Sequence, residues 1–261
     1  RIIEAALCRA ALAARAQARP VTPWVNAGST RIPLSRRRPN GKGGVEWRPY
    51  PEARICDSLP VCLFKDDAQR PVGLLFSISC HPSTVGGWSV SADYPGIACD
   101  LIDAQLGAQC SVFLQGAAGD TKAFVTGRTT DDTGLPCFRS AGFEGVAETG
   151  HLLADEVMAA LKHRRPDTPL LRSAILESYW ALQPLPERAE FEDLLGKYNP
   201  ARGLSVREHL RRLERGLANP EQAAILAHGI QLAKGFRLLA IEGELVGELG
   251  NHLMREGGEG V

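Results

Sequence analysis

The chain has 261 residues, of which 44% are hydrophobic, and 30 acidic side chains balance 30 basic ones. This length and composition are typical of a globular protein with one sizeable core, so we expect a single domain over residues 1–261. A net charge of zero argues against a nucleic acid as partner, and no apolar run approaches the length of a membrane span.

Seven cysteines are scattered along the chain without a Cys-x-x-Cys pair. An odd number at wide spacing predicts neither a complete disulfide framework nor a cysteine zinc cluster. We therefore expect buried thiols, a use of cysteine that favours a reducing compartment.

Helical periodicity begins at the first residues, where apolar side chains recur at Ile2, Ile3, Ala6, Leu7, Ala10 and Ala11. Neither an initiator methionine nor an N-cap residue precedes this pattern, so we expect the chain to begin inside a helix of a longer protein. Residues 26–60, rich in Gly, Pro and Arg, are predicted to be irregular. Three adjacent arginines start at Arg36; such a run is usually a solvated surface, and basic runs can also bind nucleic acid or phosphate.

An apolar strand then ends at a histidine. Residues 72–80 have the composition of a buried strand, and His81 opens the polar loop that follows. Polar residues at the C-terminal end of such a strand point into the crevice where open α/β sheets bind ligands. His81 is therefore a candidate metal ligand, and a hydrogen-bonded structural role for the same imidazole is the alternative.

A helix and a second strand complete this unit. The helix opens within residues 91–96, with Asp93 as the predicted N-cap, and a strand over residues 110–114 ends in the glycine-rich loop 116–120. The order strand, loop, helix, strand, loop predicts two neighbouring strands in the sheet interior, with both loops on one edge.

Periodicity alone predicts the remaining elements. Helices are expected over residues 144–164, 187–198 and 205–217, the last opening on a capping box at Ser205, and strands over 170–182 and 236–241. A further helix follows Glu244. The fold class predicted from this order is α/β, with a mixed or mostly parallel sheet flanked by helices.

Three segments resemble the neutral/alkaline, non-lysosomal ceramidases and their bacterial relatives. They are Phe76-x4-His81-Pro82-Ser83-Thr84, Ser91-Ala92-Asp93-x-x-Gly96 and Phe113-x5-Gly119-Asp120. The resemblance is strongest over residues 70–122 and extends less closely from the start of the chain to residue 255. It implies a ceramidase-like catalytic core, of which this chain would be a truncated central part.

The resemblance implies a catalytic Zn²⁺ ion held by two histidines, a glutamate and a tyrosine. It also implies that a water bound to this ion attacks an amide carbonyl. His81 matches the second histidine, and Glu244 matches the carboxylate of a Gly-Glu pair. The alternative for Glu244 is a place in the first turn of the next helix, where the helix dipole favours a carboxylate. The first histidine, in a Thr-His-Thr-His-like segment, and the tyrosine have no counterpart here, so we expect this chain to bind zinc poorly and to be inactive.

The resemblance implies further site residues. Arg36 lies in a segment similar to the family's Asn-Arg-Arg and would bind a substrate carbonyl or carboxylate, because a guanidinium stays protonated. Asp120 is a second candidate catalytic residue, and Asp93 and Gly116 are candidate substrate-binding residues. Gly116 stands where ceramidases carry a serine often assigned a catalytic role, which favours zinc-activated water over a serine nucleophile.

The substrate implied is a small-molecule or lipid amide of the ceramide type, which would place the protein in sphingolipid metabolism. The resemblance also implies export or a periplasmic location, with peripheral membrane contact by the full-length protein; the oligomeric state is not predicted. A second class of function stays open, a non-catalytic or differently catalytic relative that keeps the fold as a binding module. A complete set of metal ligands in the full-length gene would distinguish the two.

Overall fold

The computed structural model describes residues 2–184, 187–195, 200–217 and 221–257. Contacts between residues divide the chain into two compact units. The first comprises Arg1–Ser173, Ile230–Leu238 and Glu244–Val261, and the second comprises Ala174–Gly229 and Leu239–Gly243. The single domain expected over residues 1–261 stays a prediction.

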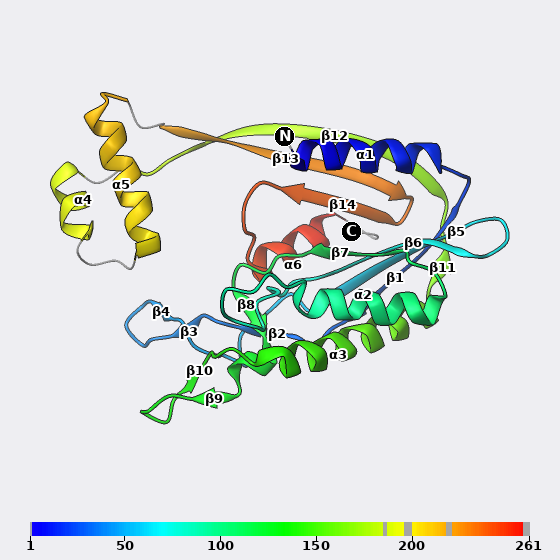
Figure 1. Cartoon of the computed structure of the whole chain (residues 1–261), viewed down its shortest axis with the longest axis horizontal. Coiled ribbons are helices and arrows are strands. Elements are labelled where there is room, and N and C mark those ends of the chain that lie inside the picture. The colour runs from blue at the N-terminus through cyan, green and yellow to red at the C-terminus, as the bar shows by residue number, and fades with distance from the viewer. Residues whose placement is uncertain (1, 185–186, 196–199, 218–220, 258–261) are drawn as a thin grey trace. The chain divides into compact units, whose positions relative to one another are not determined.

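A five-stranded sheet of order β11-β1-β5-β6-β7 forms the centre of the first unit (Figure 1). Its strands are β11 (Arg165–Pro166), β1 (Thr22–Ser29), β5 (Ser58–Lys65), β6 (Pro71–Ile78) and β7 (Ser111–Gln115). β6 and β7 run parallel, whereas the pairs β5·β6, β1·β5 and β1·β11 are antiparallel. The α/β class with a mixed sheet is therefore confirmed, and the mostly parallel alternative is wrong for this sheet.

The crossover between the two parallel strands also has the predicted order. α2 (Asp93–Leu106) connects β6 to β7, and the two strands are neighbours, as expected. β7 lies at the edge of the sheet, however, so the interior position predicted for both strands is correct only for β6. The edge position leaves Val112 of β7 47% exposed.

Two helices, α2 and α3 (Gly142–Lys162), pack side by side and cover one face of this sheet (Figure 1). The core beneath them contains alternate strand residues and the apolar helix faces: Leu59, Val61, Leu63, Leu74, Phe76, Ile78, Tyr94, Ala98, Ile102, Leu153, Ala154 and Val157. Burying one such aliphatic side chain stabilises a fold by roughly 1.5–3 kcal/mol. On the other face, Cys62 of β5 is buried against Ala233 and Phe236.

Short two-stranded sheets order the loops, and one of them, β2·β8, joins segments far apart in sequence. β2 (Pro33–Ser35) pairs with β8 (Thr121–Ala123), β3 (Arg38–Pro39) with β4 (Val45–Glu46), and β9 (Thr129–Thr130) with β10 (Pro136–Cys137). The 3-10 helix η1 (Phe124–Gly127) follows β8. The prediction that residues 26–60 are irregular is wrong, since they contain half of β1 and all of β2, β3 and β4. Pairing of β1 with β5 along its whole length imposes a strand that its own composition does not favour.

The remaining described elements are α1 (Ile2–Ala16), α4 (Arg188–Leu195), α5 (Pro200–Glu214), α6 (Gly247–Glu256) and a sheet of order β12 (Pro169–Ala181), β13 (Gln222–Ala233) and β14 (Phe236–Ile241). α5 begins at Pro200, so the capping box predicted at Ser205 lies inside the helix and is wrong. The end predicted for the preceding helix, residues 196–198, lies outside the described residues. None of the described helices is long and apolar enough to cross a membrane.

Burial of the cysteines follows their elements. Cys56, Cys62 and Cys80 are buried, as expected, and all seven cysteines are free. The expectation is wrong for Cys8, because α1 has no buried residue and the thiol is exposed.

Candidate active site

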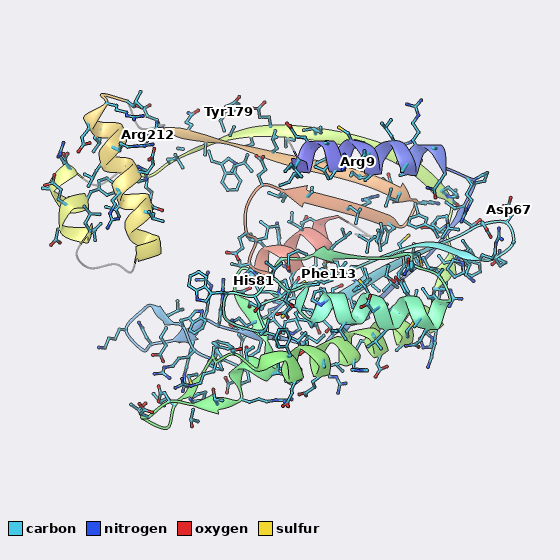
Figure 2. All side chains as sticks on the ribbon, in the orientation of Figure 1. Arg9, Asp67, His81, Phe113, Tyr179 and Arg212 are labelled. Carbon is cyan, nitrogen blue, oxygen red and sulfur yellow. The ribbon has the colours of Figure 1, made fainter. Side chains whose placement is uncertain are left out.

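His81 follows β6 at the edge of the sheet where the parallel pair ends (Figure 2). Gly116 follows β7 at the same edge, and its N–H donates to the carbonyl of Ile78 at 3.0 Å. The placement of both loops on one edge is therefore confirmed. The backbone of His81 also forms a parallel bridge with Lys122 of β8, which joins a third loop to this edge.

The two phenylalanines of the sequence resemblance support these loops from below. Phe76 of β6 packs edge to face against Phe113 of β7, with ring centroids 5.8 Å apart. Figure 2 labels Phe113. Tyr94 packs against Phe113 at 6.3 Å. Phe76 and Tyr94 are buried in the core and Phe113 packs against it, so these rings support the loops from the core side.

Buried contacts hold the loop that carries His81. The carboxylate of Asp93 accepts the N–H groups of Thr84 at 2.9 Å and Val85 at 3.1 Å. Tyr94 donates its hydroxyl to the carbonyl of Cys80 at 2.7 Å. Burial raises the pKa of the Cys80 thiol to about 12, so this neighbour of His81 is a neutral thiol at physiological pH.

Asp93 was predicted as the N-cap of α2 and as a substrate-binding residue. The N-cap position belongs to Ala92, no side chain caps the helix, and Asp93 is the first helical residue with a φ of +50°. The N-cap prediction is wrong: Oδ2 accepts from the preceding loop, and Oδ1 accepts the N–H of the adjacent Tyr94 at 2.8 Å. Asp93 is only 5% exposed and its oxygens accept backbone N–H groups, so its contacts are those of a positioning residue. Its substrate-binding role stays a prediction.

Glu244 lies between β14 and α6. The helix begins at Gly247 with Val246 as N-cap, so the alternative that placed Glu244 in the first helical turn is wrong. The N–H of Gly119 donates to the carbonyl of Leu245 at 2.7 Å, which fixes this segment against the loop after β7. A Cβ atom at Gly119 would lie 2.9 Å from that carbonyl oxygen, so the approach requires glycine.

His81, Glu244 and Arg36 converge although they are far apart in sequence. Oε1 of Glu244 contacts Nε2 of His81 and lies 3.7 Å from Nη2 of Arg36. The same Nη2 is 3.5 Å from Nε2 of His81 and donates to the carbonyl of Gly119 at 2.9 Å. Side-chain exposure is 25% for His81 and 58% for Glu244, so ligands can reach both groups.

The chemistry of Nε2 depends on its proton. With a proton, Nε2 donates to Glu244; without one, its single lone pair either accepts from Arg36 or is available to a metal ion beside the carboxylate oxygen. Imidazole nitrogen and carboxylate oxygen are both zinc ligands, with bonds of about 2.0–2.2 Å. The two donor types therefore fit a zinc ion.

The described part of the chain supplies too few ligands for a complete zinc site. Catalytic zinc normally has three protein ligands and a water. Within residues 2–257, apart from the gaps, no group of three or more His, Cys, Asp and Glu side chains is arranged to hold a metal. His81 and Glu244 would supply two of the ligands.

Asp120 and Gly116 were also predicted at the site. Oδ1 of Asp120 accepts the N–H of Gly247 at 2.8 Å, and its carbonyl accepts the N–H of Arg36 at 2.8 Å. These bonds tie the start of α6 and Arg36 to one loop; the catalytic role of Asp120 stays a prediction. At Gly116 a Cβ atom would lie 2.8 Å from Oγ of Ser79 and 2.9 Å from the carbonyl oxygen of Ile78, so the position has no room for a side chain. Its substrate-binding role stays a prediction too.

Two further cations lie at this site, Arg37 of the basic run and Lys122, and the sequence assigned neither of them a role. Nη2 of Arg37 donates to the carbonyl of Gly119 at 3.4 Å. Nζ of Lys122 donates to the carbonyl of Ser83 at 3.3 Å. The proximity of Lys122 in sequence to the Gly-Asp segment was the available signal, but its pairing with His81 depends on contacts that the sequence does not reveal.

No protein-family model matches the chain, and no curated protein matches it in sequence. Among solved structures, the neutral ceramidase from Pseudomonas aeruginosa superposes with a TM-score of 0.61 and 16% identity, over 95% of this chain and 44% of that one. A ceramidase complexed with C2 superposes with a TM-score of 0.60 and 15% identity, over 93% of this chain and 44% of that one. The chain thus spans less than half the length of these ceramidases, and it has the ceramidase-like α/β fold that the sequence resemblance implied.

Proposed function

We propose that the protein is a zinc-dependent hydrolase of amide or related bonds that acts on N-acyl substrates of the ceramide type. The observation that carries the proposal is the convergence of His81, Glu244 and Arg36 beside the parallel strand pair. Similarity of the whole chain to ceramidase structures supports it.

Each side chain has a role that fits its surroundings. His81 and Glu244 would hold the zinc ion, which when bound lowers the pKa of water to about 7 and so supplies a nucleophile near neutral pH. Arg36 is oriented by the carbonyl of Gly119 and stays protonated. Its guanidinium would stabilise the negative charge that develops on the amide oxygen.

Hydrolysis is expected to proceed without a covalent acyl-enzyme. Gly116 offers no hydroxyl, and the close approach of Ile78 and Ser79 leaves no space for one. Within the 116–120 loop the described side chains include no serine or cysteine, so a direct attack by water fits the residues present.

The complete protein provides the test. A panel of lipid amides, short N-acyl amino acids and sugar amides is assayed before and after chelation, and with zinc restored. We expect chelation and His81→Ala each to abolish hydrolysis, and Arg36→Ala to reduce turnover by about two to three orders of magnitude. His163→Ala, at the exposed end of α3, is the matched control and should keep full activity. Full activity of His81→Ala, or a trapped acyl intermediate, would contradict the proposal.

A non-catalytic or differently catalytic binding module is the second candidate. It is favoured by one observation, that the described residues contain two of the four ligands that the resemblance implies. Binding of N-acyl compounds by the zinc-loaded complete protein, without hydrolysis of any member of the panel, would support this alternative.

A further inference from the structure

A half-buried lysine lies beside the loop that carries His81. Lys122 belongs to β8, and its backbone pairs with that of His81. Its Nζ donates to the carbonyl of Ser83 at 3.3 Å and lies 5.7 Å from the centroid of the Trp47 ring. Trp47 itself is 56% exposed, so an ammonium and an apolar ring are presented together.

Two guanidinium groups add to this charge. Arg36 and Arg37 both donate to the carbonyl of Gly119, at 2.9 and 3.4 Å. A single carbonyl oxygen cannot satisfy all the N–H donors of two arginines, each of which has five. Donors therefore remain available to a ligand at this loop.

Carboxylates neutralise little of this positive charge. Arg36 is paired with Glu244 at 3.7 Å, whereas in the described part of the chain no carboxylate lies within 4.0 Å of Arg37 or Lys122. If Glu244 also serves a zinc ion, the net charge of the site becomes more positive still. An anion is the ligand that such a surface favours.

The surroundings of Lys122 disfavour the charged form of its side chain. Its pKa is lowered, first by burial and then by the guanidinium of Arg36, while the carboxylate of Asp93 acts in the opposite direction. Burial and Arg36 both disfavour the charged lysine, and an anion placed against it would offset them by favouring the charged form. The geometry, a half-buried cation beside an accessible loop with unused donors, is that of a binding position.

We propose that Lys122 and Arg37 bind an anionic group of the substrate, a carboxylate or a phosphate, and that Lys122 determines this specificity. The inference rests on the proposed hydrolysis of N-acyl compounds and deepens it at the head group, where it expects a preference for anionic compounds over ceramide, whose head group is neutral. The preferred substrates would be N-acyl compounds that carry a negative charge near the amide, ahead of N-acyl compounds with a neutral head group.

Two matched pairs of ligands test the charge preference by calorimetry on the metal-free chain. The pairs are N-octanoylglycine with N-octanoylglycinamide, and N-octanoylethanolamine phosphate with N-octanoylethanolamine. At least one anionic member is expected to bind about tenfold more tightly than its neutral partner, as for a hydrogen bond to a charged group, and the difference should shrink at high salt. A carboxylate preference and a phosphate preference are read out separately.

Variants then locate the preference. Lys122→Ala should remove it, Lys122→Arg should keep it, and Lys162→Ala, an exposed lysine at the end of α3, is the matched control. If Lys122→Ala does not fold, Lys122→Met replaces it, since methionine keeps an unbranched apolar side chain and removes the charge. Equal binding within both pairs, no binding of any of the four compounds, or an unchanged preference in the neutral variant would overturn the inference.

Failure of the two proposals can be distinguished, because the binding test involves neither zinc nor turnover. A charge preference in a protein that never hydrolyses an amide would overturn the proposed function alone. Zinc-dependent hydrolysis with no charge preference in binding would overturn only the inference about Lys122.

Discussion

Gly119 joins three segments of the candidate site through its backbone. Its carbonyl accepts from Arg36 and Arg37, and its N–H donates to the carbonyl of Leu245. The peptide groups around this residue therefore set the distance between the arginines and the Glu244 segment. A side chain at Gly119 would disturb the contacts of the arginines and those of the Glu244 segment.

We expect Gly119→Ala to destabilise the protein by about 1–3 kcal/mol, the usual cost of forcing an atom into a packed position. The added Cβ would lie 2.9 Å from the carbonyl oxygen of Leu245 and 3.1 Å from that of Glu244. Denaturant unfolding measures the difference. Gly203→Ala, inside α5, is the control, because its Cβ atom would meet nothing within 4 Å. This variant should be more stable than the parent by about 0.5–1 kcal/mol. Equal stability of Gly119→Ala and the parent would contradict the close approach.

At the scale of elements, the β9–β10 hairpin depends on one carboxylate. Asp131 accepts the N–H groups of Thr133 at 2.9 Å and Leu135 at 3.2 Å, and pairs with Arg48 at 2.7 Å. The hydrogen bond from the Thr133 hydroxyl, followed by that from Arg48, holds the pKa of Asp131 well below its usual range. The turn and its attachment to Arg48 therefore require the charged form.

Asp131→Asn should lower the melting temperature at neutral pH, and the difference should shrink in acid. A carboxyl whose pKa is depressed by folding contributes stability that is present above its unfolded pKa of about 3.9 and is lost as the pH falls through the lower folded value. Thermal unfolding of both proteins at neutral pH and below about pH 3 measures this trend. Asp132→Asn, next to it in the same turn, is the control; a difference that stays constant with pH would show that the charge of Asp131 is not responsible.

How far the sequence predicts the fold depends on the range of the interactions that determine each element. The β6–α2–β7 unit is predictable because its apolar period and its loops are local, and α3 and β14 follow for the same reason. β1 is not predictable in this way, because pairing with β5 determines it. The N-cap of α2 was misassigned because the carboxylate of Asp93 bonds to residues eight and nine positions away, which no capping pattern includes.

The site shows the same limit. His81 is predictable from its position at a strand end, and Glu244 from the resemblance alone. The place of Lys122 is not predictable, because nothing in its sequence neighbourhood indicates that it is half-buried beside His81. The absence of room at Gly116 likewise depends on the path of β6, which only the fold reveals.

Across the whole molecule, the described residues contribute two candidate zinc ligands. We therefore expect the 261-residue chain, incubated with zinc and then dialysed, to retain much less than one zinc ion per chain, since catalytic sites use three protein ligands. Elemental analysis of the dialysed protein gives the ratio, with His81→Ala as the comparison. Tightly held, stoichiometric zinc would instead indicate a third ligand within these residues, and Asp120→Asn would test the first suspect.

The closeness of the ends of β6 and β7 at Gly116 has a consequence for protein engineering. Installing a new reactive group at this position by a single substitution would push the ends of two paired strands apart, because backbone atoms of Ile78 stand in the way. Removing the hydroxymethyl group of Ser79 as well would relieve only one of the two clashes. A designer who wishes to change the chemistry of this loop would therefore need to lengthen the loop or redesign the end of β6.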